Sequence, residues 1–314
     1  MTVLFLQTSE STYRPLLEQT SRTVREYCSR HGCSYELVFG ILRGFYPWQA
    51  TFNRISMLGQ LLDAGHTGWV CYMDADAYIA DLDFDVRTYL IDKSGTSPII
   101  GAGAPDAPWW HVNAGVFLIN LSHPAGKRIV RGWSYRFGTI TDLELQSYDD
   151  WATAPEDQLL LAQTLQAMPE IEGTVHVDKQ VPHVINYSDG LFIKQQLRAY
   201  GSFEERVRRT TEEVDAVLDP VRQRSVMRNR AVAALAQIEE EIARALCTTI
   251  LLREPEPSEL RDAVDQLRCG ASVAELIESR FRCTEFAEKY HLFLRKYVFT
   301  EAGVVDGWHG NGAR

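Results

Sequence analysis

WVCYMDADAY, residues 69–78, is an uninterrupted apolar run that ends in two aspartates separated by one small residue. The run predicts a buried strand over residues 69–73. Side chains two positions apart in an extended segment point to the same side, so the carboxylates of Asp74 and Asp76 can meet one ion. They follow the carboxyl end of the strand, where open α/β sheets bind ligands. Carboxylate oxygens suit Mg²⁺ or Mn²⁺, and such a cation would stabilise a diphosphate as a leaving group.

A second interpretation of the motif is a polar strand end that leads into an acidic turn. Three more aspartates follow, at Asp81, Asp83 and Asp85. They alternate with Leu82 and Phe84, a pattern typical of a solvated strand edge.

The first 200 residues alternate short apolar runs with amphipathic segments, which is typical of an α/β layered domain. Further strands are predicted at residues 3–6, 35–38, 98–103 and 116–119. Apolar residues recur at helical spacing over residues 13–30, 52–62 and 156–166.

The sequence becomes rich in Arg, Glu and Ala after about residue 200 and predicts long helices broken at Pro220. Ser258 precedes a helix that stops at Gly270, and Ser272 with Glu275 forms a capping box for the next. Thr284 can cap a third helix that reaches residue 298. We therefore expect a first domain over residues 1–202, an all-helical module over 203–302 and a loose glycine-rich tail over 303–314.

Bulk properties exclude some classes of function. The net charge of -10 and the pI near 5.3 disfavour a nucleic-acid binder. An acidic chain can still bind an anionic nucleotide if a divalent cation lies between them. No apolar segment is long enough to span a bilayer, and the N-terminus lacks the features of a signal peptide. The six cysteines form no CxxC pair, so we expect a cytoplasmic protein with reduced thiols.

Three blocks of sequence share a likeness to one group of enzymes. They are YMDADAY at 72–78, VNAGVFLINL at 112–121 and EDQ at 156–158. In this order they resemble the GT-A glycosyltransferases, and more closely the retaining glycogenin-like and lipopolysaccharide galactosyltransferases and the galactosyl/xylosyltransferases. The likeness covers roughly residues 1–200. It implies a Rossmann-like nucleotide-diphospho-sugar transferase domain, followed here by the all-helical module.

The resemblance also implies roles for individual residues. Asp74 and Asp76 would bind the metal, and Arg54 and the strand end Gln7-Thr8-Ser9 would contact the donor. Asn113 and Gly115 would lie beside the transferred sugar, while Asp157 and Gln158 would face the reacting centre. Each has a plainer interpretation: Asn113–Gly115 as a turn, Asp157 as a helix N-terminal carboxylate, and Arg54 as half of a surface ion pair.

One position departs from the family's pattern. Related enzymes supply a histidine as third metal ligand in a run of the type aromatic-x-x-His. The best match here is Phe192-Ile193-Lys194-Gln195, which puts Gln195 in that place. His183 or His176 is an alternative ligand, and Lys194 could face the diphosphate.

The loop before Asn113 contains Trp109, Trp110 and His111. Aromatic faces suit sugar rings, so this loop is a candidate acceptor site. The alternative is that the two tryptophans close the core.

The C-terminal third resembles a small helical domain of unknown function found in bacterial surface-polysaccharide and secreted proteins. It implies a bacterial envelope-glycan context, with dimerisation, partner docking or shielding of the catalytic domain as its job. Arg206, Arg208 and Arg209 either touch anionic lipid at the inner face of the membrane or form a solvated face.

These observations predict a metal-dependent transfer of a sugar, with retention, from a nucleotide-sugar donor such as a UDP-sugar to a glycan or lipid-linked acceptor in surface polysaccharide synthesis. A non-catalytic binding protein on the same scaffold is the alternative, supported by the missing histidine. A phosphohydrolase also places DxD after an apolar strand, but such enzymes carry it near the first strand.

Overall fold

A computed structural model describes residues 1–151, 154–196, 201–220, 237–246, 248, 253–269 and 271–281. The chain forms two compact units, Met1–Arg222 and Gln223–Arg314. Within the described part of the chain, no helix combines the length and the apolar character needed to span a membrane.

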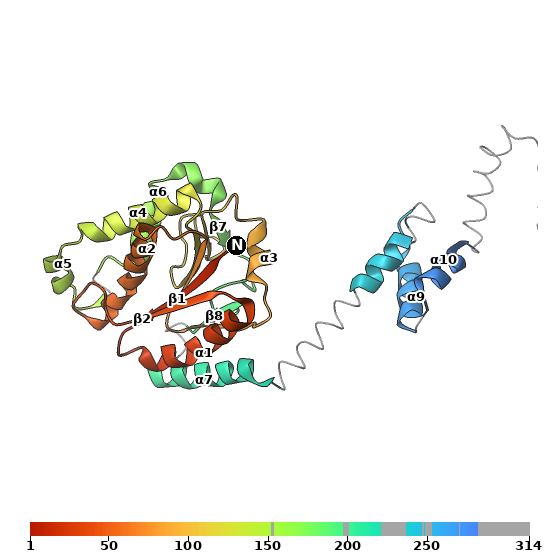
Figure 1. Cartoon of the computed structure of the whole chain (residues 1–314), viewed down its shortest axis with the longest axis horizontal. Helices are drawn as coiled ribbons and strands as arrows, with labels where there is room; N and C mark the ends of the chain where they lie inside the picture. The colour runs from red at the N-terminus through yellow and green to blue at the C-terminus, as the bar shows by residue number, and fades with distance from the viewer. Residues whose placement is uncertain are drawn as a thin grey trace, which may run out of the picture. The chain divides into compact units, whose positions relative to one another are not determined.

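A mixed six-stranded sheet forms the centre of the first unit (Figure 1). Its strands are β1 (Val3–Ser9), β2 (Ser34–Phe39), β3 (Trp69–Met73), β5 (Ile99–Ala102), β6 (Val116–Asn120) and β7 (His176–Asp178). They follow the order β2-β1-β3-β6-β5-β7. β1 is parallel to both β2 and β3, whereas β6 is antiparallel to β3 and β5. The predicted α/β fold is therefore confirmed.

Both faces of the sheet are covered, which is why its central strands β3 and β6 are buried along their whole length. Along β1, Leu4 and Leu6 belong to one core cluster, and Val3 and Phe5 belong to the other. The first cluster lies under α2 (Asn53–Asp63), α4 (Pro124–Thr139) and α6 (Asp157–Gln166). The second lies under α1 (Arg14–His31), α3 (Val86–Ile91) and a small sheet of β4 (Ala77–Ile79) and β8 (Ile193–Gln195).

Shorter elements complete the first unit. They are the 3₁₀ turns η1 (Pro47–Phe52) and η3 (Pro169–Thr174) and the helix α5 (Asp142–Ser147). α3 corrects one expectation, because Asp85 does not lie on a strand edge. Its carboxylate accepts hydrogen bonds from the backbone N–H groups of Arg87 and Thr88 and so caps this helix.

The helix α7 (Phe203–Leu218) packs along α1 and belongs to the first unit, which ends at Arg222. The sequence had placed this helix in the helical module, with a boundary at residue 202. The difference has a physical cause: α7 buries Arg206, Thr210 and Val214 on one face, at four-residue spacing.

The described part of the second unit is helical, with residues 237–246, α9 (Pro257–Arg268) and α10 (Val273–Phe281). The Ser272–Glu275 capping box is confirmed by reciprocal hydrogen bonds. Ser258 is not the cap of α9, because Pro257 takes the first helical position and Glu256 precedes it as N-cap. The predicted third helix and the tail lie outside the described residues.

Gly126 in α4 tests the packing of this helix on the sheet. A Cβ at this position would lie 2.1 Å from the backbone oxygen of Asn120. Gly126→Ala should therefore lower the free energy of unfolding by about 2 kcal/mol or more, measured by chemical denaturation. Gly138→Ala is the matched control in the same helix, because nothing lies within 4 Å of its Cβ. It should raise stability slightly, by up to about 1 kcal/mol; an equal loss in both variants would contradict this packing.

Candidate active site

The two aspartates of the DxD motif lie in a tight turn between β3 and β4. The backbone N–H of Ala77 donates to the carbonyl oxygen of Asp74 at 3.0 Å, which closes the turn. The buried Gln7 amide donates to the carbonyl oxygens of Asp74 and Ala77, at 3.2 and 3.0 Å. The carboxylates therefore converge because of this turn, and not because of the extended pleat that the sequence suggested.

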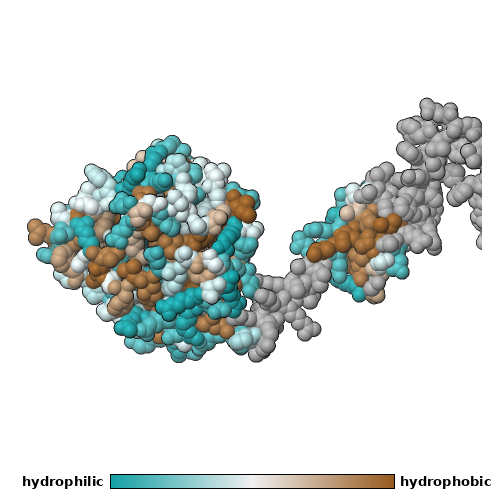
Figure 2. Space-filling model, viewed as in Figure 1, coloured by the Kyte–Doolittle hydropathy of each residue, from teal (hydrophilic) through white to brown (hydrophobic). Residues whose placement is uncertain are grey.

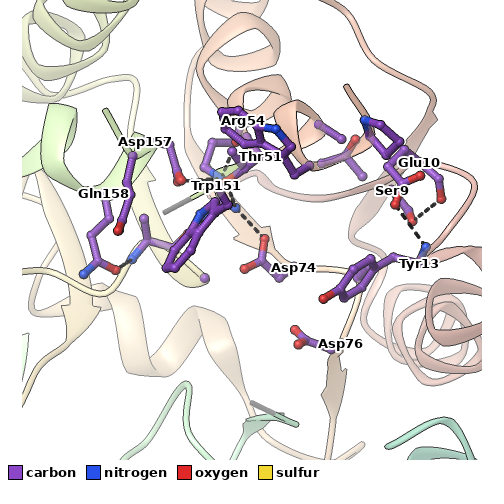
Figure 3. A pocket seen from close by; sticks show the side chains of 18 of the residues that line it. Ser9, Glu10, Tyr13, Thr51, Arg54, Asp74, Asp76, Trp151, Asp157 and Gln158 are labelled. Carbon is purple, nitrogen blue, oxygen red and sulfur yellow. Dashed lines mark hydrogen bonds and ion pairs between the residues drawn. The ribbon is translucent and has the colours of Figure 1, made fainter. Parts of the chain in front are cut away.

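Asp74 and Asp76 open into a cavity of about 730 Å³ at the carboxyl ends of β1 and β3. Ten residues that the sequence predicted line it: Thr8, Ser9, Arg54, Asp74, Asp76, Asn113, Gly115, Asp157, Gln158 and Gln195. Figure 3 shows Ser9, Glu10 and Tyr13 on one side of Asp74, with Asp157 and Gln158 on the other. The three sequence blocks thus meet in one place.

Arg54 joins two of these blocks by ion pairs. Its Nη2 lies 2.6 Å from Oδ1 of Asp74, and its Nε lies 3.2 Å from Oδ2 of Asp157. Arg54 is only 4% exposed, so it pairs with acids of the cavity and not with a surface acid. Thr51 donates its hydroxyl to Asp157 at 2.6 Å, which fixes that carboxylate at the start of α6.

Opposing effects act on the pKa of the Asp74 carboxyl. Burial raises the pKa of this carboxyl to about 7, against the lowering effect of the Arg54 guanidinium; Asp76 and Asp157 raise it further. Binding a cation would require the deprotonated form.

Asp76 is held by a residue that the sequence did not predict for the site. Arg206 of α7 forms an ion pair with Oδ2 of Asp76, and its Nε donates to the carbonyl oxygen of Gln196 at 3.1 Å. Arg206 is 3% exposed. Arg208 and Arg209 instead pair with exposed glutamates, and Figure 2 shows mostly hydrophilic residues along the lower edge of the first unit, where α7 lies. The helical spacing of Arg206, Thr210 and Val214 was the available signal.

Gln195 bridges the two aspartates. Its Nε2 donates to Oδ1 of Asp76 at 2.8 Å and to Oδ2 of Asp74 at 3.3 Å. Its Oε1 is buried and has no hydrogen-bond partner. Gly115 makes room for this amide, because a Cβ there would lie 2.6 Å from Oε1.

The neighbouring polar side chains fix the backbone around Gly115. Asn113 Oδ1 accepts from the N–H of Gly115 at 2.8 Å, and Gln158 Oε1 accepts from the N–H of Ala114 at 3.1 Å. The Asn113–Gly115 segment is thus a turn, as its plainer interpretation had it, and also a wall of the cavity.

Several predicted site residues lie outside the lining of the cavity. His183 is buried and pairs through Nδ1 with Asp189 at 2.9 Å. His176 lies on β7, and Lys194 lies on β8 opposite Tyr78. Trp109 and Trp110 pack against the first core cluster, and His111 is exposed. Among the residues with described side chains, no three His, Cys, Asp or Glu residues come together as a metal site.

Removing the Arg206 guanidinium should leave the Asp76 carboxylate buried without a positively charged side chain beside it. Arg206→Gln is expected to lower the free energy of unfolding by about 3–5 kcal/mol in metal-free buffer. Arg209→Gln, whose ion pair is exposed, should cost less than about 1 kcal/mol. Tryptophan fluorescence during denaturation is a suitable probe, because six of the seven tryptophans lie in the first unit. Equal stabilities of the two variants would mean that the Arg206 pair does not form.

Comparison with known proteins identifies the fold. Residues 1–113 match the family model of the galactosyl transferase GMA12/MNN10 family. A glycosyltransferase involved in the glycosylation of the major capsid of PBCV-1 has a similar structure, with a TM-score of 0.50 and 16% identity over 67% of this chain and 98% of that chain.

A second solved structure is the galactosyltransferase LgtC in complex with donor and acceptor sugar analogs, with a TM-score of 0.38 and 12% identity over 68% of this chain and 95% of that chain. No curated protein matches the sequence. The family match and the fold shared with the first structure confirm the predictions of a GT-A fold and of a glycosyltransferase.

Proposed function

We propose that this glycosyltransferase transfers a sugar from a nucleoside diphosphate sugar, such as a UDP-sugar, to a hydroxyl of a glycan or lipid-linked acceptor. Asp74, Asp76 and Gln195 would hold the Mn²⁺ or Mg²⁺ that this transfer requires. The charge of the cavity carries the proposal. Six carboxylates and one guanidinium line it within the described part of the chain. An anionic diphosphate can enter such a site only together with a cation.

The residues present fit a hard divalent cation. Asp74 and Asp76 supply carboxylate oxygens, which Mn²⁺ and Mg²⁺ favour. The Nε2 of Gln195 points toward both carboxylates. This orientation is the one expected when no cation is bound, because the amide then donates to the two anions. Turning the amide by half a rotation would present its unpartnered Oε1 to the same point. When bound, the cation neutralises the diphosphate and stabilises it as a leaving group.

The donor's nucleoside would lie at the end of β1, against Thr8, Ser9 and Tyr13, which line the cavity. Figure 3 shows Ser9 and Tyr13 on the side away from Asp157. This is the carboxyl edge of the parallel strands, where such sheets bind nucleotides. The transferred sugar would then lie beside Asn113 and Gly115, within reach of Asp157 and Gln158.

The chain's own side chains would stabilise the charges of the reaction. The bond from the sugar's anomeric carbon to the diphosphate breaks, and the acceptor oxygen bonds to that carbon. Asp157, which accepts from the Thr51 hydroxyl and pairs with Arg54, would stabilise the positive charge that develops on the sugar. The acceptor proton passes to the leaving diphosphate oxygen, on the same face, so the configuration is retained. An NMR time course that follows the anomeric proton of the product tests retention.

Calorimetry with a panel of UDP- and GDP-sugars tests the donor and the metal together. We expect one donor to bind in Mn²⁺ and binding to be lost in EDTA. Asp74→Asn should weaken binding in Mn²⁺ by about a hundredfold or more, because a ligand of the cation is lost. Asp106→Asn is the control, since this exposed carboxylate lies outside the cavity lining. Binding that is equal in Mn²⁺ and EDTA would exclude the metal, and no binding of any donor would contradict the proposed function.

Gln195→Glu tests the third ligand with an isosteric side chain. The new carboxylate would repel Asp74 and Asp76 in the absence of metal, so the metal-free protein should lose stability. The same charge should raise Mn²⁺ affinity, measured by calorimetry without donor, by about tenfold or more. If Gln195 only spaces the two aspartates, Mn²⁺ affinity will stay the same or fall.

A further inference from the structure

The cavity extends beyond the residues assigned to the donor. Its lining also includes three aromatic residues: Tyr46 and Trp48, at the start of η1, and Trp151, in the segment before α6. These three are here called the aromatic wall. Figure 3 shows Trp151 on the same side of Asp74 as Asp157 and Gln158, away from Ser9 and Tyr13. Trp151 therefore lies on the side of the residues proposed to face the reacting sugar.

The aromatic wall offers apolar faces to the cavity. Trp151 is 37% exposed and lines the cavity with a large indole ring. Trp48 packs against the Phe52 ring, with the two ring centroids 5.8 Å apart, and against the first core cluster. Its indole N–H is buried, so the exposed Trp151 ring is the one that a ligand in the cavity can stack on.

Negative charge dominates this end of the cavity. Asp149, Glu156 and Asp157 line it. Arg54 is the sole guanidinium or ammonium group of the described lining, and it already pairs with Asp74 and Asp157. A phosphate or carboxylate on a ligand at this end would meet like charges without a cation to balance them. Carboxylates instead suit the hydroxyl groups of a neutral sugar, from which they accept hydrogen bonds.

We propose that the aromatic wall is the acceptor subsite and that it binds an uncharged sugar ring of a glycan. The inference rests on the proposed function, since it places the acceptor across the reacting centre from the donor. The apolar C–H face of the ring stacks on Trp151, and its hydroxyls bond to Asp149. The acceptor hydroxyl thereby lies next to Asp157, on the side where the new bond to the anomeric carbon must form.

This assignment moves the acceptor from the loop that the sequence indicated. Trp109 and Trp110 pack edge to face, with ring centroids 5.8 Å apart, and rest against the core. Neither lines the cavity. Trp109 is therefore a natural control residue for Trp151: both are partly exposed tryptophans of the same unit, and only one faces the proposed ligand.

Saturation-transfer NMR on the full chain, loaded with UDP and Mn²⁺, tests the proposal. The probes are methyl glucoside and methyl galactoside, each compared with its uronide, which differs by one carboxylate. We expect saturation of the ring C–H protons of a neutral glycoside and a signal weaker by about fivefold for its uronide. Trp151→Ala should reduce the neutral signal by about fivefold, whereas Trp151→Phe and Trp109→Ala should preserve it.

The UDP protons in the same samples separate the two possible failures. Saturation of UDP without that of any neutral glycoside would overturn the acceptor subsite and leave the donor site intact. Absence of both signals would overturn the acceptor subsite and the proposed function together. A uronide signal equal to the neutral one would overturn the charge argument. A matched sample without UDP is the reference: a glycoside signal seen there and absent with UDP would mean that the wall binds the nucleobase, which would overturn the acceptor subsite. The comparison of glycoside and uronide needs no variant, so it holds even if Trp151→Ala fails to fold.

Discussion

The buried ion pairs of Arg54 hold the centre of this protein together. One guanidinium from α2 reaches Asp74 after β3 and Asp157 at the start of α6. Arg54 and Asp157 are buried, and the Asp74 side chain is 28% exposed where it faces the cavity. Since a buried charge without a partner is very costly, Arg54 and Asp157 can only be buried together. The sheet and the helices that cover it must therefore meet in one arrangement at this point. That arrangement also places the DxD turn and the start of α6 on the same cavity.

A second arginine completes the balance of charge. Arg206 pairs with Asp76, so each aspartate of the DxD motif has its own guanidinium. The side-chain amide of Gln195 then links the two carboxylates, because its Nε2 donates a hydrogen bond to each of them. The carboxylates are thus stabilised without a metal, and both lie within hydrogen-bond distance of the same Gln195 nitrogen. Because Arg206 comes from α7, this helix helps to hold one aspartate of the DxD turn in place.

The elements and site residues that could be predicted from the sequence are those that depend on a local pattern of residues. Apolar runs located β3 and β6 with little error, and the three motif blocks contain ten of the 24 residues that line the cavity. Contacts between distant residues left no local pattern: Arg206 and Asp76 are 130 positions apart, and β8 has only three residues. The tryptophans show the same limit, since aromatic character alone cannot distinguish a ring packed on the core, such as Trp109, from one that lines a cavity, such as Trp151.

The central claim is that a divalent cation lies between Asp74 and Asp76 under the donor's diphosphate. Anomalous X-ray scattering from crystals grown with Mn²⁺ and UDP tests it most directly. The account predicts one strong manganese peak between the two carboxylates, with the Gln195 amide oxygen turned toward it and the diphosphate on its other side. UDP bound in the cavity with no manganese peak, and with Arg54 or Arg206 on the phosphates instead, would contradict it.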